Sequence, residues 1–260
     1  RPPRSTPKPS SAASDVYKRQ TNNCVLLRPL LCLSHSNVSH PRRLKMKDAV
    51  IVSGARTPVG RFGGAFKDVS APDLGSQAIK TALKRAGITP DMVDEVVIGN
   101  AVQAAEAGYA ARLASLKSGI PQEVPTIAIN RQCSSGLEAI NMAAQLIRTG
   151  EAEIAVAGGT ENMSQVPYMI EYQARFDGLR MGNSTLVDGL TEGLGCPVNR
   201  YHMGVTAENV AERFGVSRKD QDELAFISHQ RASTAASEGR FTNQITETVS
   251  YTHLTLPTKA

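Results

Sequence analysis

Short apolar runs alternate with helix-like segments between residues 47 and 246, and this alternation constrains the fold more than any other feature of the sequence. Four of the runs are typical of buried strands, at residues 49–55, 95–100, 126–130 and 153–159. Between them apolar residues recur at helical spacing, and Gly87, Gly119 and Gly150 mark the expected helix ends. Strands that alternate with helices indicate a layered α/β domain.

The composition changes after Met163, where strand signals fade and Gly, Asn and Pro interrupt the sequence. We expect residues 163–246 to form an inserted or lid-like region rather than another part of the sheet. A helix is predicted towards its end, because Ser217 can cap a helix that carries Asp220 three residues later.

Two stretches near opposite ends of the chain do not resemble evolved protein. Residues 10–20 (SSAASDVYKRQ) and 249–258 (VSYTHLTLPT) can be encoded by the complementary strands of one DNA segment, which resembles a transposase adaptor used in sequencing. A genuine disordered tail would leave this complementarity unexplained, so we exclude both stretches from fold and function. We therefore interpret residues 1–45 as a non-native or leader segment and residues 247–260 as an adaptor-like tail.

Residues 21–45 carry no acid and are rich in Arg and Ser, as a transit peptide is. Translated DNA upstream of Met46 has the same character, and the adaptor-like stretch just before favours this second interpretation. We therefore expect a cytoplasmic location, with organellar targeting by residues 21–45 as the alternative.

The formal net charge of +5 comes from the first segment. Residues 1–45 hold nine Lys and Arg against one acid, whereas residues 46–246 hold nineteen against twenty-two. The basic excess therefore does not support nucleic-acid binding, and no apolar run approaches the roughly 18 residues of a membrane span. The spacing of the four cysteines predicts neither a metal site nor a disulfide framework; they are Cys24, Cys32, Cys133 and Cys196.

Cys133 stands where an apolar run gives way to a helix. Behind it, apolar residues recur at helical spacing, at Leu137, Ile140, Ala144 and Ile147. The unpaired N–H groups and the positive end of the dipole at a helix start favour a thiolate. Small residues at positions 134–136 leave room for a substrate and leave first-turn amides free as oxyanion donors. Cys133 is thus a candidate nucleophile, and the alternative from these residues alone is an inert buried cysteine.

The residues around Cys133 belong to a wider resemblance. NRQCSSGLEAI (130–140) closely resembles the acyl-enzyme motif of thiolases, and GNAVQA and GIPQEVP occupy the expected places before it. Three further stretches are similar to thiolase motifs: ARTPVGRFGGAF (55–66), AGGTENMSQVPY (157–168) and YHMGVTAENVAERFGVSRKDQD (201–222). Together they cover residues 47–246 in order, and on these motifs the chain is identified as a member of the thiolase family.

The resemblance implies a layered α-β-α fold, with an N-terminal α/β domain at residues 46–162 and an incomplete loop-domain insertion that covers CoA at residues 163–246. It also implies acyl transfer in two steps. Cys133 takes an acyl group from a thioester, and acetyl-CoA then attacks the acyl-cysteine to give a 3-ketoacyl-CoA, or the reverse cleavage occurs. Acyl-CoA and acetyl-CoA are the expected substrates, with no cofactor, metal ion, nucleic acid or membrane involved. The whole protein is expected to be a homodimer or homotetramer.

The motifs also imply roles for single residues. The backbone amide of Cys133 would form half of an oxyanion hole, and His202 and Met203 would line the pocket for pantetheine and the acyl group. A general-base role for His202 is not favoured, since in the family this role belongs to another histidine, and His229 is expected to be a solvated or capping residue. We expect structural roles, rather than a CoA-phosphate clamp or a catalytic acid, for Arg56, Arg61 and Glu161.

Three catalytic segments of thiolases, Gly-His-Pro, Cys-x-Gly-Gly-Gly and Asn-Glu-Ala, do not occur in the sequence. We therefore expect the C-terminal domain to be absent from this chain, and the chain alone to lack thiolase activity. The substrate type is open: YHMGVTAENVA favours an acetoacetyl-CoA thiolase, while NRQCSSG also occurs in the longer-chain type. The alternatives are a decarboxylating condensing enzyme, which the residues before Cys133 disfavour, and a non-catalytic lipid-binding relative, which would have lost the nucleophile.

Overall fold

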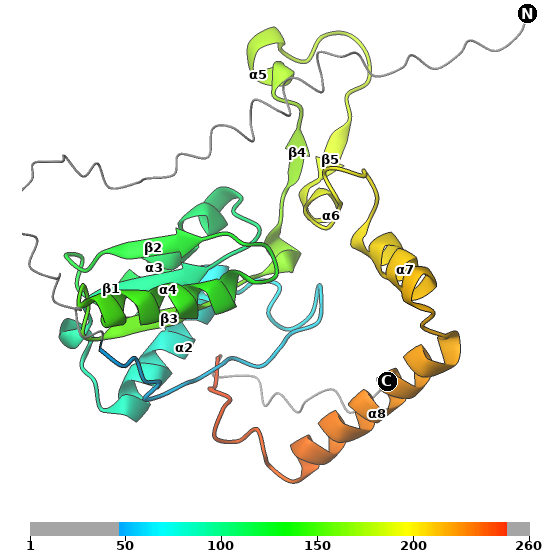
Figure 1. Cartoon of the computed structure of the whole chain (residues 1–260). Coiled ribbons are helices and arrows are strands. Elements are labelled where there is room, and N and C mark those ends of the chain that lie inside the picture. The colour runs from blue at the N-terminus through cyan, green and yellow to red at the C-terminus, as the bar shows by residue number, and fades with distance from the viewer. Residues whose placement is uncertain (1–46, 249–260) are drawn as a thin grey trace, which may run out of the picture. The chain divides into compact units, whose positions relative to one another are not determined.

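The computed structural model describes residues 47–248 (Figure 1). The predictions for residues 1–45, for the adaptor-like stretches at 10–20 and 249–258, and for Cys24 and Cys32 lie outside the described residues. No helix in the described part of the chain is long and apolar enough to cross a bilayer.

A three-stranded parallel sheet, in the order β2-β1-β3, lies at the centre of the α/β part. Its strands are β1 (Glu95–Gly99), β2 (Thr126–Ile129) and β3 (Ala155–Gly159). β1 is the middle strand, and its Val96, Val97 and Ile98 are almost fully buried. A continuous apolar run is what a parallel strand covered on both faces requires. Three of the four predicted strands are therefore confirmed.

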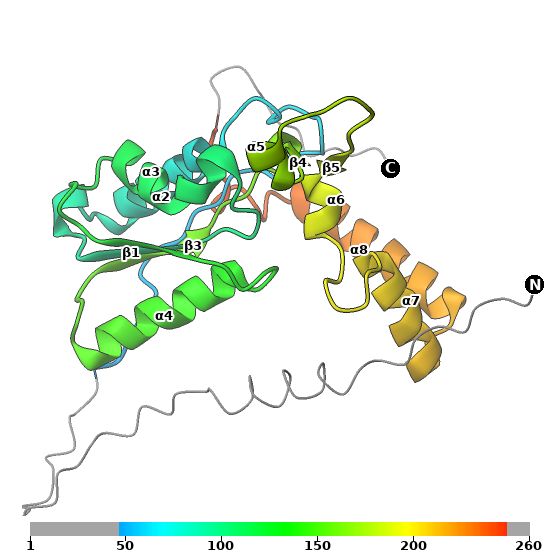
Figure 2. The same cartoon turned by 90° about the horizontal axis from the view of Figure 1, so that it is seen from above.

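Helices cover both faces of this sheet (Figure 2). α2 (Ala71–Ala86) and α3 (Ala110–Lys117) lie on one face, and α4 (Ser135–Thr149) lies on the other. Because side chains alternate along β1, Val96 and Ile98 pack with α2 and α3, whereas Val97 packs with α4. The predicted α-β-α layering is confirmed.

The helix ends follow local chemistry. Ser70 caps α2 by accepting a hydrogen bond from the N–H of Asp73, and Gly87 ends the helix at φ 68°. Gly150 ends α4 in the same left-handed conformation, at φ 84°, and Gly119 follows α3 at φ 92°. Glycine adopts this conformation without steric cost, so the predicted stops at these three glycines are confirmed. Three short 3-10 helices connect the longer elements, at Pro90–Met92, Ala105–Tyr109 and Met163–Gln165.

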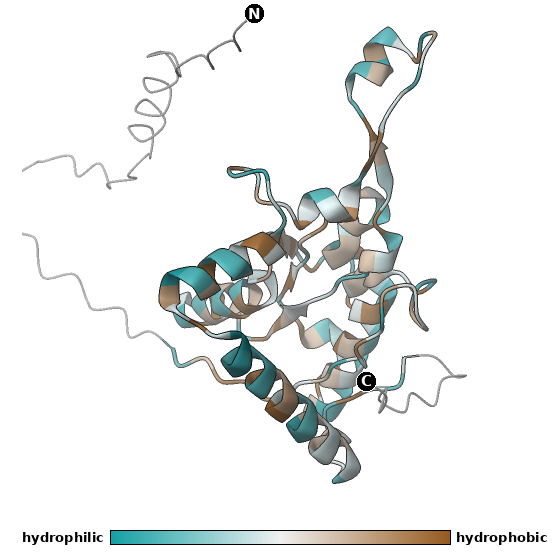
Figure 3. Cartoon of the chain, turned by 90° about the vertical axis from the view of Figure 1, so that its right-hand side faces the viewer, coloured by the Kyte–Doolittle hydropathy of each residue, from teal (hydrophilic) through white to brown (hydrophobic). Residues whose placement is uncertain are grey.

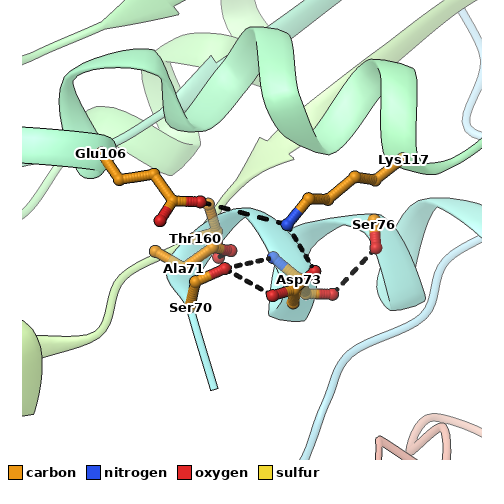
Figure 4. A network of polar contacts seen from close by, with 7 residues as sticks. All are labelled: Ser70, Ala71, Asp73, Ser76, Glu106, Lys117 and Thr160. Atoms are coloured by element: carbon orange, nitrogen blue, oxygen red, sulfur yellow. Dashed lines mark hydrogen bonds and ion pairs between the residues drawn. The ribbon is translucent and has the colours of Figure 1, made fainter. Parts of the chain in front are cut away.

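A polar network joins the two helices on the first face (Figure 4). The ammonium of Lys117 in α3 lies 2.7 Å from a carboxylate oxygen of Asp73 in α2 and 4.0 Å from Glu106. The hydrogen bond from Lys117, supported by one from Ser70, holds the pKa of Asp73 below its ordinary value. The network therefore fixes the start of α2 against the end of α3.

Residues 49–55 do not form the buried strand that their apolar character predicts. Val50, Ile51 and Val52 are 73%, 83% and 69% exposed. Both sides of β1 are occupied by β2 and β3, and within residues 47–248 no strand pairs with this segment. An apolar run becomes a strand only where a neighbour takes its backbone hydrogen bonds. Directly after this segment, Arg56 forms an isolated parallel β-bridge with Ile245.

Residues 163–246 add no strand to the central sheet. They contain a separate antiparallel pair, β4 (Tyr168–Ile170) and β5 (Leu186–Asp188), which the sequence did not indicate. Four helices complete the region: α5 (Gln173–Asp177), α6 (Gly189–Gly193), α7 (Met203–Phe214) and α8 (Arg218–Ser237). α8 begins with the predicted capping box of Ser217 and Asp220. Figure 3 shows both hydrophobic and hydrophilic residues along the helices of the described part of the chain.

Candidate active site

Cys133 is exposed in the turn that joins β2 to α4. The residue before it, Gln132, has a positive φ of 52°, which is uncommon for a residue with a side chain. Ser135 holds this turn, because its hydroxyl donates to the Gln132 carbonyl at 2.6 Å and accepts from the Arg131 N–H at 2.8 Å. A strained backbone beside an exposed cysteine is typical of functional positions.

Three glycines bring the start of α4 directly onto the sheet. A Cβ built on Gly99 would lie 2.4 Å from the backbone carbon of Ser135 and 2.6 Å from the nitrogen of Gly136. A Cβ on Gly159 would lie 3.3 Å from the Cα of Gly136. Backbone therefore packs against backbone here, which only glycine allows. This contact fixes the helix start, and with it the position of Cys133, at the carboxyl ends of β1 and β3.

Asn130 connects the Cys133 turn to the loop after β1. Its side-chain amide donates to the carbonyl of Ala101 at 2.9 Å, and its side-chain oxygen accepts from the N–H of Gln132 at 3.0 Å. One side chain thus ties the loop that follows the central strand to the residue next to the thiol. Sequence reasoning missed Asn130, although an Asn directly after an apolar run is a signal for such a tie.

The three residues after β3 each hold a different loop. The Thr160 hydroxyl donates to the Ala71 carbonyl at 2.6 Å. A carboxylate oxygen of Glu161 accepts from the N–H groups of Ala101 and Val102, at 2.8 and 3.2 Å. The Asn162 amide donates to two carbonyls in the segment before α2, those of Phe66 and Val69. Glu161 thus bonds inside the protein, next to the loop that contacts the Cys133 turn.

Two details of α4 differ from expectation. Its Leu137 and Ile140 are 63% and 40% exposed, and the sheet is faced instead by the small residues Ala139 and Ala143. Met142 and Leu146, further along the same side of α4, are partly buried and pack against this cluster. The spacing of the apolar residues therefore predicted the helix correctly, but Leu137 and Ile140 lie on the face that points away from the sheet.

The first-turn amides are also less free than predicted. The N–H of Ser134 donates to the Arg131 carbonyl at 3.2 Å, and that of Ser135 donates to the Gln132 carbonyl at 3.0 Å. The turn at Gln132 directs these carbonyls back towards the helix start. Neither amide is available as an oxyanion donor in this conformation.

His202 and Met203 lie at the start of α7. His202 caps the helix, since its Nδ1 accepts the N–H of Gly204 at 3.0 Å. The neutral ring then carries its proton on Nε2. The Met203 side chain is 43% exposed. Within residues 47–248 no hydrogen bond joins Cys133 to His202, and the predicted role of the pair in lining a pocket stays a prediction.

The remaining candidates lie apart from the thiol. Arg56 places its guanidinium 5.2 Å from the centre of the Phe241 ring. Arg61 is exposed in a turn, and His229 is exposed on α8. Cys196 accepts a hydrogen bond at its sulfur from the N–H of Asn199 at 3.3 Å, which lowers the pKa of its thiol. No cluster of His, Cys, Asp and Glu in the described part of the chain has the arrangement of a metal site.

Comparison with known proteins identifies relatives along most of the chain. Residues 49–253 match the family described as thiolase, N-terminal domain. The acetyl-CoA acetyltransferase of Cupriavidus necator is 47% identical over 201 residues, which are 77% of this chain and 51% of that protein. A probable acetyl-CoA acyltransferase of Staphylococcus aureus is 46% identical over the same shares of both chains.

Among solved structures, the Bacillus anthracis acetyl-CoA acetyltransferase is similar with a TM-score of 0.76 and 38% sequence identity. The match covers 81% of this chain and 53% of that one. The chain therefore spans about half the length of the relatives it matches.

Proposed function

The chain belongs to the thiolase family, and we propose that its protein transfers acyl groups between coenzyme A thioesters through an acyl-cysteine at Cys133. The observation that carries this proposal is the exposed thiol of Cys133, fixed at the start of α4 by the backbone contact of Gly99 with Ser135 and Gly136. A nucleophile needs both access to its substrate and a fixed geometry, and this position supplies both.

In the proposed first step, the sulfur of Cys133 bonds to the carbonyl carbon of an acyl-CoA. The bond from that carbon to the CoA sulfur then breaks, and CoA leaves as its thiol after taking up the proton that Cys133 loses. The negative charge that develops on the carbonyl oxygen needs hydrogen-bond donors. The N–H of Cys133 is the proposed donor from this chain, since the amides of Ser134 and Ser135 are occupied by Arg131 and Gln132.

In the second step, the methyl carbon of acetyl-CoA gives up a proton and attacks the acyl carbon. The bond from that carbon to the Cys133 sulfur breaks, the sulfur takes up the proton, and a 3-ketoacyl-CoA leaves. The Gly-His-Pro, Cys-x-Gly-Gly-Gly and Asn-Glu-Ala segments that would supply bases and further donors are not in this sequence. We therefore propose that the 260-residue chain alone does not complete the cycle. CoA-dependent cleavage of acetoacetyl-CoA by the purified chain would contradict this.

A single-turnover experiment tests the acyl-cysteine. The chain is incubated with acetyl-CoA, digested, and searched by mass spectrometry for an acetyl group on the Cys133 peptide. Acetylation of Cys133 that is absent from Cys133→Ser and retained in Cys196→Ser is the expected result. Equal labelling of both cysteines, or none at Cys133, would refute Cys133 as the specific acyl acceptor.

Substrate and assembly follow from the same family membership as proposals. An acetoacetyl-CoA substrate is slightly favoured over longer chains by the sequence around His202, and pocket shape decides such a preference. A decarboxylating condensing enzyme and a non-catalytic lipid-binding protein are the less favoured functions. We propose CoA thioesters as substrates without a cofactor, and a homodimer or homotetramer for the whole protein. The cytoplasmic location stays a prediction.

A further inference from the structure

Two carboxylates tie β1 to β3, one at each end of the strands. At the amino end, an oxygen of Asp94 accepts the N–H groups of Glu153 and Ile154, at 2.8 and 3.0 Å. At the carboxyl end, an oxygen of Glu161 accepts the N–H groups of Ala101 and Val102, at 2.8 and 3.2 Å. The two ties have the same chemistry and differ in what lies next to them.

Only the tie at the carboxyl end continues to the thiol. Glu161 holds the N–H of Ala101, and the carbonyl of Ala101 accepts the side-chain amide of Asn130 at 2.9 Å. The oxygen of the same Asn130 side chain accepts the N–H of Gln132 at 3.0 Å. Gln132, at φ 52°, directly precedes Cys133. A series of hydrogen bonds therefore runs from the carboxylate to the residue before the cysteine.

The second oxygen of Glu161 strengthens this arrangement. It accepts from the side chain of Asn100 at 2.9 Å, and Asn100 is 1% exposed. The same Asn100 amide also donates to the Thr160 carbonyl at 2.9 Å. With both oxygens bonded, Glu161 has a fixed orientation, and hydrogen bonds to a charged acceptor are stronger than neutral ones. A fixed carboxylate at the end of the sheet can define the position of the loop that Asn130 contacts.

We propose that Glu161 is a positioning residue for Cys133, which acts through the Ala101 carbonyl and Asn130 to hold the Gln132 backbone in its left-handed conformation. A residue with a side chain keeps such a conformation only where its surroundings enforce it. Without the tie, residues 101–102 shift, Asn130 loses its acceptor, and the turn that presents Cys133 is no longer fixed. The proposal rests on the proposed function only in taking Cys133 as the reactive thiol.

The test compares the reactivity of two thiols, those of Cys133 and Cys196, in the same molecule. Rate constants for alkylation by iodoacetamide are determined for Cys133 and Cys196 by peptide-resolved mass spectrometry, and the ratio of the two is compared among variants. Cys196 has no bond to the network and serves as an internal reference for exposure and reagent. Asp94→Ala is the matched control, because it removes an equivalent tie at the far end of the same strands.

Glu161→Ala is expected to lower the ratio of Cys133 to Cys196 reactivity about tenfold, since the reactivity of a thiol towards a free reagent depends on the donors and the helix terminus beside it, and without the tie the sulfur no longer keeps its place at the start of α4. Asn130→Ala, which removes both hydrogen bonds of this side chain without placing a charge beside the thiol, is expected to lower it equally. Because both act in one series, the double variant should fall no further than either single variant, within about a factor of two. Asp94→Ala should leave the ratio unchanged.

Two results would overturn the proposal. One is a ratio in Glu161→Ala that equals that of Asp94→Ala, which would make Glu161 a structural tie and nothing more. The other is a double variant whose losses multiply, which would mean that Glu161 does not act through Asn130. If circular dichroism shows Glu161→Ala to be unfolded, Glu161→Leu replaces it, because leucine keeps much of the side-chain volume but accepts no hydrogen bond from Ala101 or Val102. An unchanged ratio in that variant overturns the proposal too.

The proposed acyltransferase function is tested by a different reaction from the positioning role of Glu161. Alkylation needs only a reactive thiol, whereas acetylation by acetyl-CoA needs acyl transfer. A wild-type chain that is not acetylated at Cys133 but shows the expected ratios refutes the acyltransferase and leaves the positioning role intact.

Discussion

The packing of Gly99 against α4 predicts that Gly99→Ala is among the most damaging single-methyl substitutions in the chain. The new Cβ would lie 2.4 Å from the backbone carbon of Ser135 and 2.6 Å from its carbonyl oxygen, where 3.4–4 Å is an ordinary contact. The neighbours are backbone atoms, so no side chain can rotate away. The first turn of α4 must therefore move by about 1 Å relative to β1 to restore ordinary contact.

The magnitude follows from this displacement. Overpacking a core costs about 1–3 kcal/mol, and we expect about 3 kcal/mol because both sides of the contact are backbone. For a domain of about 200 residues, that lowers the melting temperature by roughly 6–12 °C. Since Cys133 stands at the same helix start, its acetylation by acetyl-CoA should slow by up to about 100-fold.

The glycines of the sheet supply graded controls. Gly159→Ala meets its nearest atoms at 3.3 Å, and should cost about 1 kcal/mol. Gly158→Ala, one residue earlier in β3, meets nothing within 4 Å and should stay within about 0.5 kcal/mol of the wild type. Urea unfolding followed by circular dichroism gives the free energies, and mass spectrometry gives the acetylation rates. A Gly99→Ala chain as stable and as reactive as Gly158→Ala would refute the reasoning.

Three further predictions concern the polar contacts. The hydrogen bond from Lys117 keeps the pKa of Asp73 below its unfolded value of about 3.9. The ionised Asp73 therefore stabilises the fold fully above that pH, and this stabilisation is lost as the pH falls through the lower folded pKa. Urea unfolding midpoints should decrease over this acidic range in the wild type, and this part of the decrease should be missing in Asp73→Asn. Ser217→Ala should destabilise α8 by about 1 kcal/mol, visible as faster amide exchange in its first turn, and unchanged exchange would contradict the role of the capping box. His202→Asn should keep a hydrogen-bond acceptor for the Gly204 N–H, whereas His202→Ala should lose about 1 kcal/mol of α7 stability; equal protection of that amide in both variants would argue against the cap.

The sequence predicts an element well where its own residues determine it. β1 is a continuous apolar run, and α8 begins with a capping box, so both were located from local patterns. Residues 49–55 have an equally apolar pattern, yet a strand also needs a neighbour, which no local pattern reports. The same limit applies to α4, where helical spacing at Leu137 and Ile140 could not show which face meets the sheet.

In the candidate site, too, some features follow from adjacent residues and others depend on residues far away in the sequence. The position of Cys133 at a helix start follows from adjacent residues, and the structure places it there. The contacts that hold Cys133 in place do not follow from adjacent residues. Glu161 accepts hydrogen bonds from residues 101–102, which lie about sixty positions away in the sequence. The amides around the helix start were predicted to be free, and those of Ser134 and Ser135 are not, because the turn at Gln132 directs the carbonyls of Arg131 and Gln132 onto them.

The central position of β1 also sets the order in which the sheet can be completed during synthesis. Val96 pairs with Thr126, and Glu95 pairs with Ala155, so both partners of β1 are made after it. At about 5–20 residues per second, the second partner is synthesised several seconds after β1. Pairings over such separations form late and keep apolar segments accessible to other chains. β1, the most buried strand of the finished sheet, is thus the strand that stays unpaired and accessible to other chains for longest during synthesis.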